Sequence, residues 1–104
     1  MAALDVEIVR FVDSHQPGFV ECAITDAQGS KHLFVEKLPV VTVEALSENS
    51  SYPRRGTIQC VLLERWRDAT GTELVSVDTS KPWSIESTAG QTRFEVLASQ
   101  VTAC

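Results

Sequence analysis

The stretch that decides the fold is Thr57–Asp78, TIQCVLLERWRDATGTELVSVD. At its start, apolar residues alternate with polar ones, so that Ile58, Cys60 and Leu62 share one face of an extended chain. Asp68-Ala69-Thr70-Gly71-Thr72 interrupts this alternation, which resumes over 73–78. Asp suits the start of a type I turn, and Gly suits the left-handed position of the bulge that follows it. The stretch predicts two antiparallel strands joined by a tight turn.

The same turn pattern, Asp-Ala-x-Gly-[Ser/Thr], occurs at 26–30 between the alternating runs 19–25 and 31–36. A third hairpin is expected around 87–90, where it would join 83–86 to 92–97. The first run, 4–12, ends in a Pro-Gly loop at 13–18. The sequence therefore predicts six or seven strands linked mostly by hairpins.

So many strands in a short chain must cover their edges, and a twisted sheet does this by closing into a barrel or folding into a sandwich. We expect an all-β fold, a small and partly open antiparallel barrel, with a β-sandwich as the alternative. Between 38 and 56 the pattern changes: Val40-Val41 could extend a strand, and Thr42 could cap one helical turn over 43–46. The polar segment 47–56 is expected to be a mobile or functional loop.

Length and composition indicate one domain, 1–104, with its own core. The 104 residues are 43% hydrophobic and 22% charged, which is ordinary for a globular chain. No apolar run approaches the ~20 residues of a membrane helix, and residues 1–7 lack the features of a secretory signal. The sequence predicts a cytoplasmic protein without membrane contact.

The charge balance disfavours nucleic acid as a partner. Nine basic and fourteen acidic side chains give a net charge of −5, whereas nucleic-acid binding needs a basic face. The three cysteines, Cys22, Cys60 and Cys104, are odd in number and widely spaced, so they are expected to be reduced thiols. Cys22 and Cys60 lie on the apolar phase of their strands and are expected to be buried and inert.

Sequence motifs of catalysis are absent. No nucleophile elbow, zinc helix or phosphate-binding glycine loop occurs. His32 and Glu36 share a strand phase and could join another carboxylate in a metal site, but two histidines alone do not demand one. A Cys–His nucleophile pair is disfavoured because a reactive thiolate needs an exposed, electropositive setting. We expect no cofactor and no bound metal.

Glu64 has two alternative interpretations. If the phase of Ile58, Cys60 and Leu62 continues, Glu64 faces inward at the mouth of the barrel, where burial or an arginine would shift its pKa. Alternatively, a β-bulge before Glu64 shifts the phase and returns the carboxylate to water. The sequence leaves both open.

The remaining candidates combine aromatic and arginine side chains, which protein interfaces enrich. Trp66 and Trp83 are either core residues or recognition groups, with the core as the default for Trp83, which follows Pro82 in a connection. The full set of candidate binding residues is Tyr52, Arg54, Arg55, Glu64, Arg65, Trp66, Arg67 and Trp83.

Several segments together resemble a set of small uncharacterised bacterial all-β proteins of about this length. They are Val9–Asp13, Phe34–Val40, Glu64–Asp68 and Val77–Trp83. The resemblance covers most of the chain and implies a stand-alone bacterial cytoplasmic domain. It carries no activity, cofactor or catalytic residue.

The favoured hypothesis is a non-enzymatic domain that binds another protein, as an immunity-type or adaptor protein does. A homodimer through a strand edge is a variant of it. The alternatives are a small-ligand barrel or an enzyme that uses Glu64, Glu36 or His32, and a single-stranded nucleic-acid binder, which would need a basic groove with stacked aromatics.

Overall fold

The computed structural model describes residues 1–15 and 18–103, so that part of the expected 13–18 loop and Cys104 lie outside it. Over the described residues the chain forms seven strands, one short α-helix and one 3₁₀ turn. In chain order these are β1 (Ala2–Asp13), β2 (Phe19–Thr25), β3 (Lys31–Lys37), α1 (Leu38–Val41), β4 (Arg54–Arg67), β5 (Glu73–Asp78), β6 (Arg93–Leu97), η1 (Ala98–Gln100) and β7 (Val101–Ala103).

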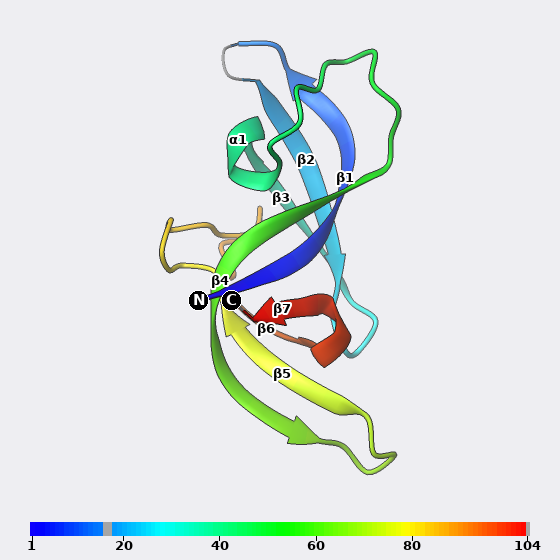
Figure 1. The fold of residues 1–104 in the computed structure, drawn as a ribbon, viewed down its shortest axis with the longest axis vertical. Coiled ribbons are helices and arrows are strands. Elements are labelled where there is room, and N and C mark those ends of the chain that lie inside the picture. The colour runs from blue at the N-terminus through cyan, green and yellow to red at the C-terminus, as the bar shows by residue number, and fades with distance from the viewer. Residues whose placement is uncertain (16–17, 104) are drawn as a thin grey trace.

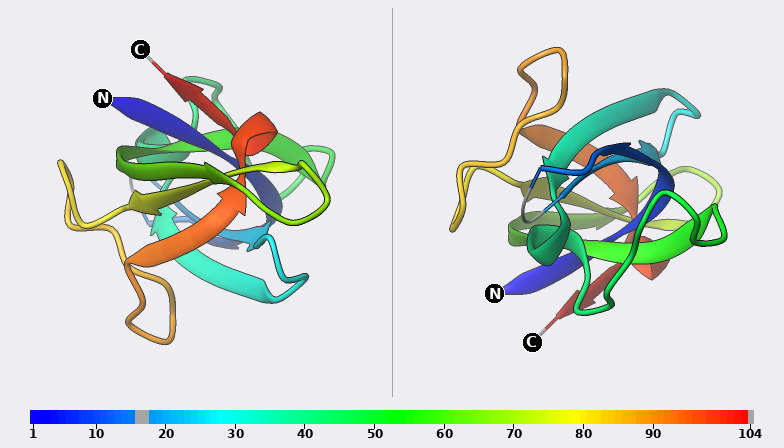
Figure 2. Two further views of the ribbon diagram at one scale, coloured as in Figure 1. Left: turned by 90° about the horizontal axis from the view of Figure 1, so that it is seen from below. Right: turned by 90° about the horizontal axis from the view of Figure 1, so that it is seen from above.

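The strands form one curled antiparallel sheet in the order β3-β2-β1-β4-β5-β6, and β7 pairs with the start of β1 (Figures 1 and 2). The two end strands, β3 and β6, approach each other across the opening of the curl. Two main-chain hydrogen bonds bridge this opening, from Thr88 N to Leu33 O and from Ala27 N to Glu95 O, each 2.8 Å long. The predicted all-β, partly open barrel is confirmed.

The core lies inside the curl because each strand turns every second side chain inward. Leu4, Val6 and Ile8 of β1 are buried as the alternation predicts, and Cys22 and Cys60 are fully buried. Phe34 of β3 and Phe94 of β6 meet across the opening with their ring centroids 5.6 Å apart. Core side chains therefore fill the interior of the barrel.

The hairpin turns follow the predicted chemistry. Asp68 Oδ1 accepts hydrogen bonds from the amides of Thr70 and Thr72, at 2.9 and 3.0 Å, and Asp26 Oδ1 accepts the equivalent pair from Gln28 and Ser30. Gly71 takes the left-handed conformation that glycine tolerates, with φ of 84°. Both Asp turns are confirmed.

The third predicted hairpin is only partly correct. Ser87 Oγ accepts from the amides of Ala89 and Gln91, so that the turn itself repeats the Asp arrangement. The segment before it, 83–86, is not a strand, and β6 pairs with β5 instead. The reason is that Ile85, 2% exposed, is buried in the core from the irregular connection 79–92.

The predicted helical turn is displaced. The helix covers Leu38–Val41, and Thr42 ends it rather than capping a helix over 43–46. Pro39 is tolerated in the first turn, where its missing N–H costs no hydrogen bond. Leu38 and Val41 bury themselves against the barrel, and the proposed strand extension at Val40-Val41 is therefore wrong.

β4 pairs with two different strands along its length. Arg54–Cys60 pairs with β1, and Val61–Arg67 pairs with β5 on the opposite side in the curled order (Figure 2). The β4–β5 hairpin therefore extends beyond the barrel at one end, and the β1–β2 hairpin extends at the other (Figure 1). None of the described helices is long and apolar enough to cross a membrane.

Candidate functional site

The eight candidate binding residues do not form one surface. Arg54 and Arg55 begin β4, whereas Glu64–Arg67 end it. At about 3.3 Å per residue, the two groups lie up to about 40 Å apart along the strand. The aromatic and basic candidates therefore separate into a group at the hairpin end and a group near the start of β4.

At the hairpin end, the pairing register shifts between Leu62 and Glu64. This bulge moves Glu64 off the inward phase, and its side chain is exposed, so the second of the two interpretations is confirmed. Arg65 pairs with Glu73 at 2.9 Å, and this hydrogen bond holds the pKa of Glu73 below its usual range. Trp66 lies half-buried on the outer face opposite Leu74.

Tyr52 and Arg54 hold the 42–53 connection in place. The Tyr52 hydroxyl donates to Ser47 O at 2.6 Å, and the ring packs against the core. Arg54 donates to Glu44 Oε2, also at 2.6 Å. These two candidates use their polar groups within the chain, so we assign them a structural role.

Trp83 and Arg55 line one cleft, which we call the Trp83 cleft. Its volume is about 440 Å³, within the ~300–1,000 Å³ range of ligand sites. Trp83 is 50% exposed, which overturns its assignment as a core residue. The lining residues are Pro39, Val40, Val41, Thr42, Val43, Arg55, Gly56, Thr57, Gln59 and Trp83.

The connection that carries Trp83 is anchored at both sides of the tryptophan. Thr79, fully buried, donates its hydroxyl to Ile85 O at 2.8 Å, and the Ile85 amide donates to Thr79 O at 3.1 Å. Between them, Ser84 has a positive φ of 54°, which non-glycine residues rarely adopt. The indole is thus presented to solvent from a loop that is tied to the core.

Val43 is the lining residue that the sequence analysis missed. Its side chain is fully exposed. The helix ends at Val41, and Thr42 continues the chain in an extended conformation. The sequence analysis placed Val43 in a helical turn, and therefore did not identify it as an exposed residue. The nearest signal was the four-residue segment Val40-Val41-Thr42-Val43, which is too short to reveal a periodicity.

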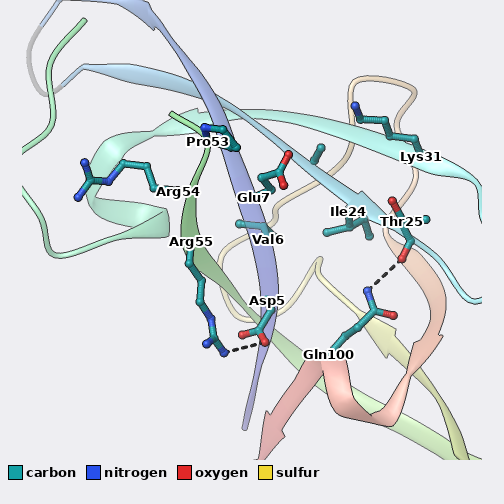
Figure 3. A pocket seen from close by; sticks show the side chains of 11 residues that line it. Asp5, Val6, Glu7, Ile24, Thr25, Lys31, Pro53, Arg54, Arg55 and Gln100 are labelled. Carbon is teal, nitrogen blue, oxygen red and sulfur yellow. Dashed lines mark hydrogen bonds and ion pairs between the residues drawn. The ribbon is translucent and has the colours of Figure 1, made fainter. Parts of the chain in front are cut away.

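A larger cleft of about 580 Å³ lies on the outer face of the sheet, and we call it the Gln100 cleft (Figure 3). It opens where β1 passes from β7, which pairs up to Leu4, to β2, which pairs from Glu7 onward. Gln100 spans it by donating to Thr25 O at 2.9 Å, and Arg55 pairs with Asp5 at 2.8 Å (Figure 3). The lining residues are Asp5, Val6, Glu7, Ala23, Ile24, Thr25, Lys31, Pro53, Arg54, Arg55 and Gln100.

The histidine and carboxylate candidates are not brought together. His32 Nε2 pairs with Asp26 Oδ2 at 2.8 Å, and its ring meets Phe94 edge-on. Glu36 shares the strand phase of His32 but lies four residues further along β3, and partial burial raises its pKa. Among the described residues no group of three His, Cys, Asp or Glu side chains could hold a metal ion.

Neither described cysteine fits a nucleophile. Burial raises the pKa of Cys22 to about 12 and that of Cys60 to about 11. At neutral pH both remain thiols, which react poorly because the thiolate is the nucleophile. This agrees with the expectation that they are buried and inert.

Comparison with known proteins adds no relative. No protein-family model matches the chain, and neither the characterised proteins nor the solved structures contain a match.

Proposed function

We propose that this protein is a non-enzymatic interaction domain that binds another protein at the Trp83 cleft. The observation that carries the proposal is the half-exposed Trp83 in the wall of a cleft that also contains the fully exposed Val43. Tryptophan is enriched among residues that dominate binding energy. A cleft lets such a residue exclude water from a partner's apolar side chain.

The anchoring of the tryptophan loop supports the same function. Binding costs less free energy when the contact residue is already ordered in the free protein. The hydrogen bonds between Thr79 and Ile85 fix the loop on both sides of Trp83. The buried thiols of Cys22 and Cys60, which are unpaired, fit a protein that works in the reducing cytoplasm.

Photo-crosslinking in cells that produce the protein tests the proposal. Val43 is replaced by the photo-reactive amino acid p-benzoylphenylalanine, and the matched control carries it at Val12, an exposed valine of β1. We expect one heavier adduct of defined mass from position 43, identified by mass spectrometry as a protein. The adduct should be absent from position 12 and lost when Trp83→Ala is added.

A Trp83→Ala chain that keeps the circular dichroism spectrum and thermal midpoint of the parent makes the loss interpretable, and Trp83→Phe should keep part of the adduct. Equal labelling from positions 12 and 43, or no adduct from position 43, would rule out the Trp83 cleft as a protein-binding site.

A further inference from the structure

One side of the Trp83 cleft is an unpaired strand edge. β1 occupies one side of β4 along Arg54–Cys60, while β5 reaches the other side only from Val61 onward. Apart from the ladder with β1, the main chain of residues 55–59 makes no hydrogen bond to any other residue within 1–15 or 18–103. In an antiparallel strand, alternate residues direct N–H and C=O away from the existing neighbour. These groups therefore face the cleft.

The cleft follows this edge. Its lining includes the neighbouring residues Gly56 and Thr57, whose side-chain positions lie on opposite faces of the strand. Because Gly56 has no side chain, the cleft reaches the main chain of β4 at this position. Val40, Val43 and Trp83 line the same cleft.

We propose that the partner adds an extended segment to the β4 edge as a new strand, with apolar side chains at alternate positions. This rests on the proposed protein-binding function and names the form of the partner. In strand addition, main-chain hydrogen bonds supply affinity, while pockets for alternate side chains supply specificity. The valines and Trp83 provide the apolar pockets.

The charged side chain at the cleft, Arg55, is directed away from the unpaired edge. It is the one charged side chain among the described residues that line the cleft, and its guanidinium binds Asp5 of β1 at 2.8 Å (Figure 3). Because β1 lies on the other side of β4, an added strand would meet main-chain groups and apolar side chains at this edge rather than a charge.

A single extended segment fits this edge better than a second copy of the protein. The cleft beside this edge has α1 with Val43 and the Trp83 loop among its walls. A second copy would bring its own pair of walls against them, whereas a lone strand has none. Dimer formation is an outcome of the test below.

Selection from a library of random heptapeptides displayed on phage tests the inference, with the Trp83→Ala protein used to remove peptides that do not need the cleft. We expect enrichment of peptides with Val, Ile or an aromatic residue at alternate positions. Failure to enrich, or enrichment of proline-rich or helical peptides, overturns the strand-addition model.

Two versions of the enriched peptide then separate strand addition from side-chain binding alone. One carries N-methyl groups on the odd amides and the other on the even amides. We expect one version to bind at least about tenfold more weakly than the unmethylated peptide, because its methyl groups replace the hydrogens that bond to β4, and the other to bind as before.

Equal binding of both methylated versions would overturn strand addition and leave the protein-binding function intact. Absence of a photo-crosslinked adduct from position 43 when Trp83 is unchanged would instead overturn the protein-binding function itself. Sedimentation at several protein concentrations completes the test. A dimer that the selected peptide dissociates would assign the β4 edge to a second copy and refute the inference.

Discussion

Gly56 is the residue at which the short helix and the long strand come closest. A Cβ atom there would lie 2.8 Å from Val41 O and 2.9 Å from Ile8 Cδ1. Because Val41 O belongs to the main chain of α1, it cannot move aside as a flexible side chain would. Glycine thus lets the helix close one end of the barrel and form a wall of the Trp83 cleft.

Gly56→Ala should therefore destabilise the fold. We expect a loss of about 1–3 kcal/mol in the free energy of unfolding, as for other overpacked sites, measured by urea denaturation. Thr57→Val, at the exposed neighbouring position, is the matched control and should stay within about 0.5 kcal/mol. An equal change in the two variants would contradict the close approach at Gly56.

The buried thiols give a second prediction at this scale. In a Cys104→Ser protein at pH 8, Cys22 and Cys60 should react with iodoacetamide at least about a hundredfold more slowly than in guanidinium chloride. The cause is burial, which raises the pKa of Cys22 to about 12 and that of Cys60 to about 11. Labelling followed by mass spectrometry checks it, and rapid labelling of the native protein would refute the burial of these side chains.

The same pKa values set a direction for stability against pH. When the pKa of a thiol is higher in the folded protein than in the unfolded chain, its contribution to the free energy of unfolding is fully present at pH values below the unfolded pKa. That contribution is lost as the pH rises from about 9 through the folded pKa values. Alkali should therefore weaken the fold more in the parent than in a Cys22→Ala variant.

At the scale of elements, the hairpin turns are the most predictable part of the molecule. One side-chain oxygen of Asp26, Asp68 or Ser87 accepts two main-chain amides, two and four residues ahead. The interaction is local, so five residues suffice to specify it. Because Ser replaces Asp in the third turn, the geometry needs a short oxygen acceptor and not a charge.

Asp68→Ser, which keeps an oxygen acceptor but loses the charge, should accordingly lower the thermal midpoint by less than Asp68→Ala, which should lower it by a few degrees. The Thr70 hydroxyl and nearby amides hold the pKa of Asp68 below its ordinary value of 3.8. The carboxylate therefore adds stability above that value, and this is lost as the pH falls through the lowered pKa. The difference in thermal midpoint between the parent and Asp68→Ala should narrow as the pH falls below 3.8, as thermal melts from pH 2 to 7 will test. A gap independent of pH would contradict the role of the charged form.

Elements that depend on distant contacts were not predictable in this way. The four-residue helix begins beside a proline and exists because Leu38 and Val41 bury themselves against the barrel. The segment 83–86 alternates like a strand, yet Ile85 is drawn into the core and the chain around it is irregular. The bulge at Leu62–Glu64 could be anticipated only as one of two alternatives. Local chemistry identified the strands and turns, while packing decided the connections.

At the scale of the whole molecule, the length of β4 separates candidate residues that are close together in the sequence. The molecule measures 45 × 26 × 24 Å, and β4 extends from the barrel into a projecting hairpin (Figure 1). Trp83 and Arg55 were both candidates and do line one cleft, whereas Trp66 and its arginines lie at the far end of β4. Sequence chemistry could identify residues suited to binding. It could not say which of them share a surface, because that depends on where a curved strand changes partners.

The pairing of β1 with β7 has a consequence for how the domain could be built into larger proteins. Ala2 and Ala103 are partners in one antiparallel ladder, so the chain enters and leaves the barrel at the same point (Figure 1). A host protein could receive the whole domain within one of its surface loops without spreading the two ends of that loop. The clefts would stay open, because neither is lined by the residues that join the host. The position of the two ends thus makes the fold suited to insertion as a unit.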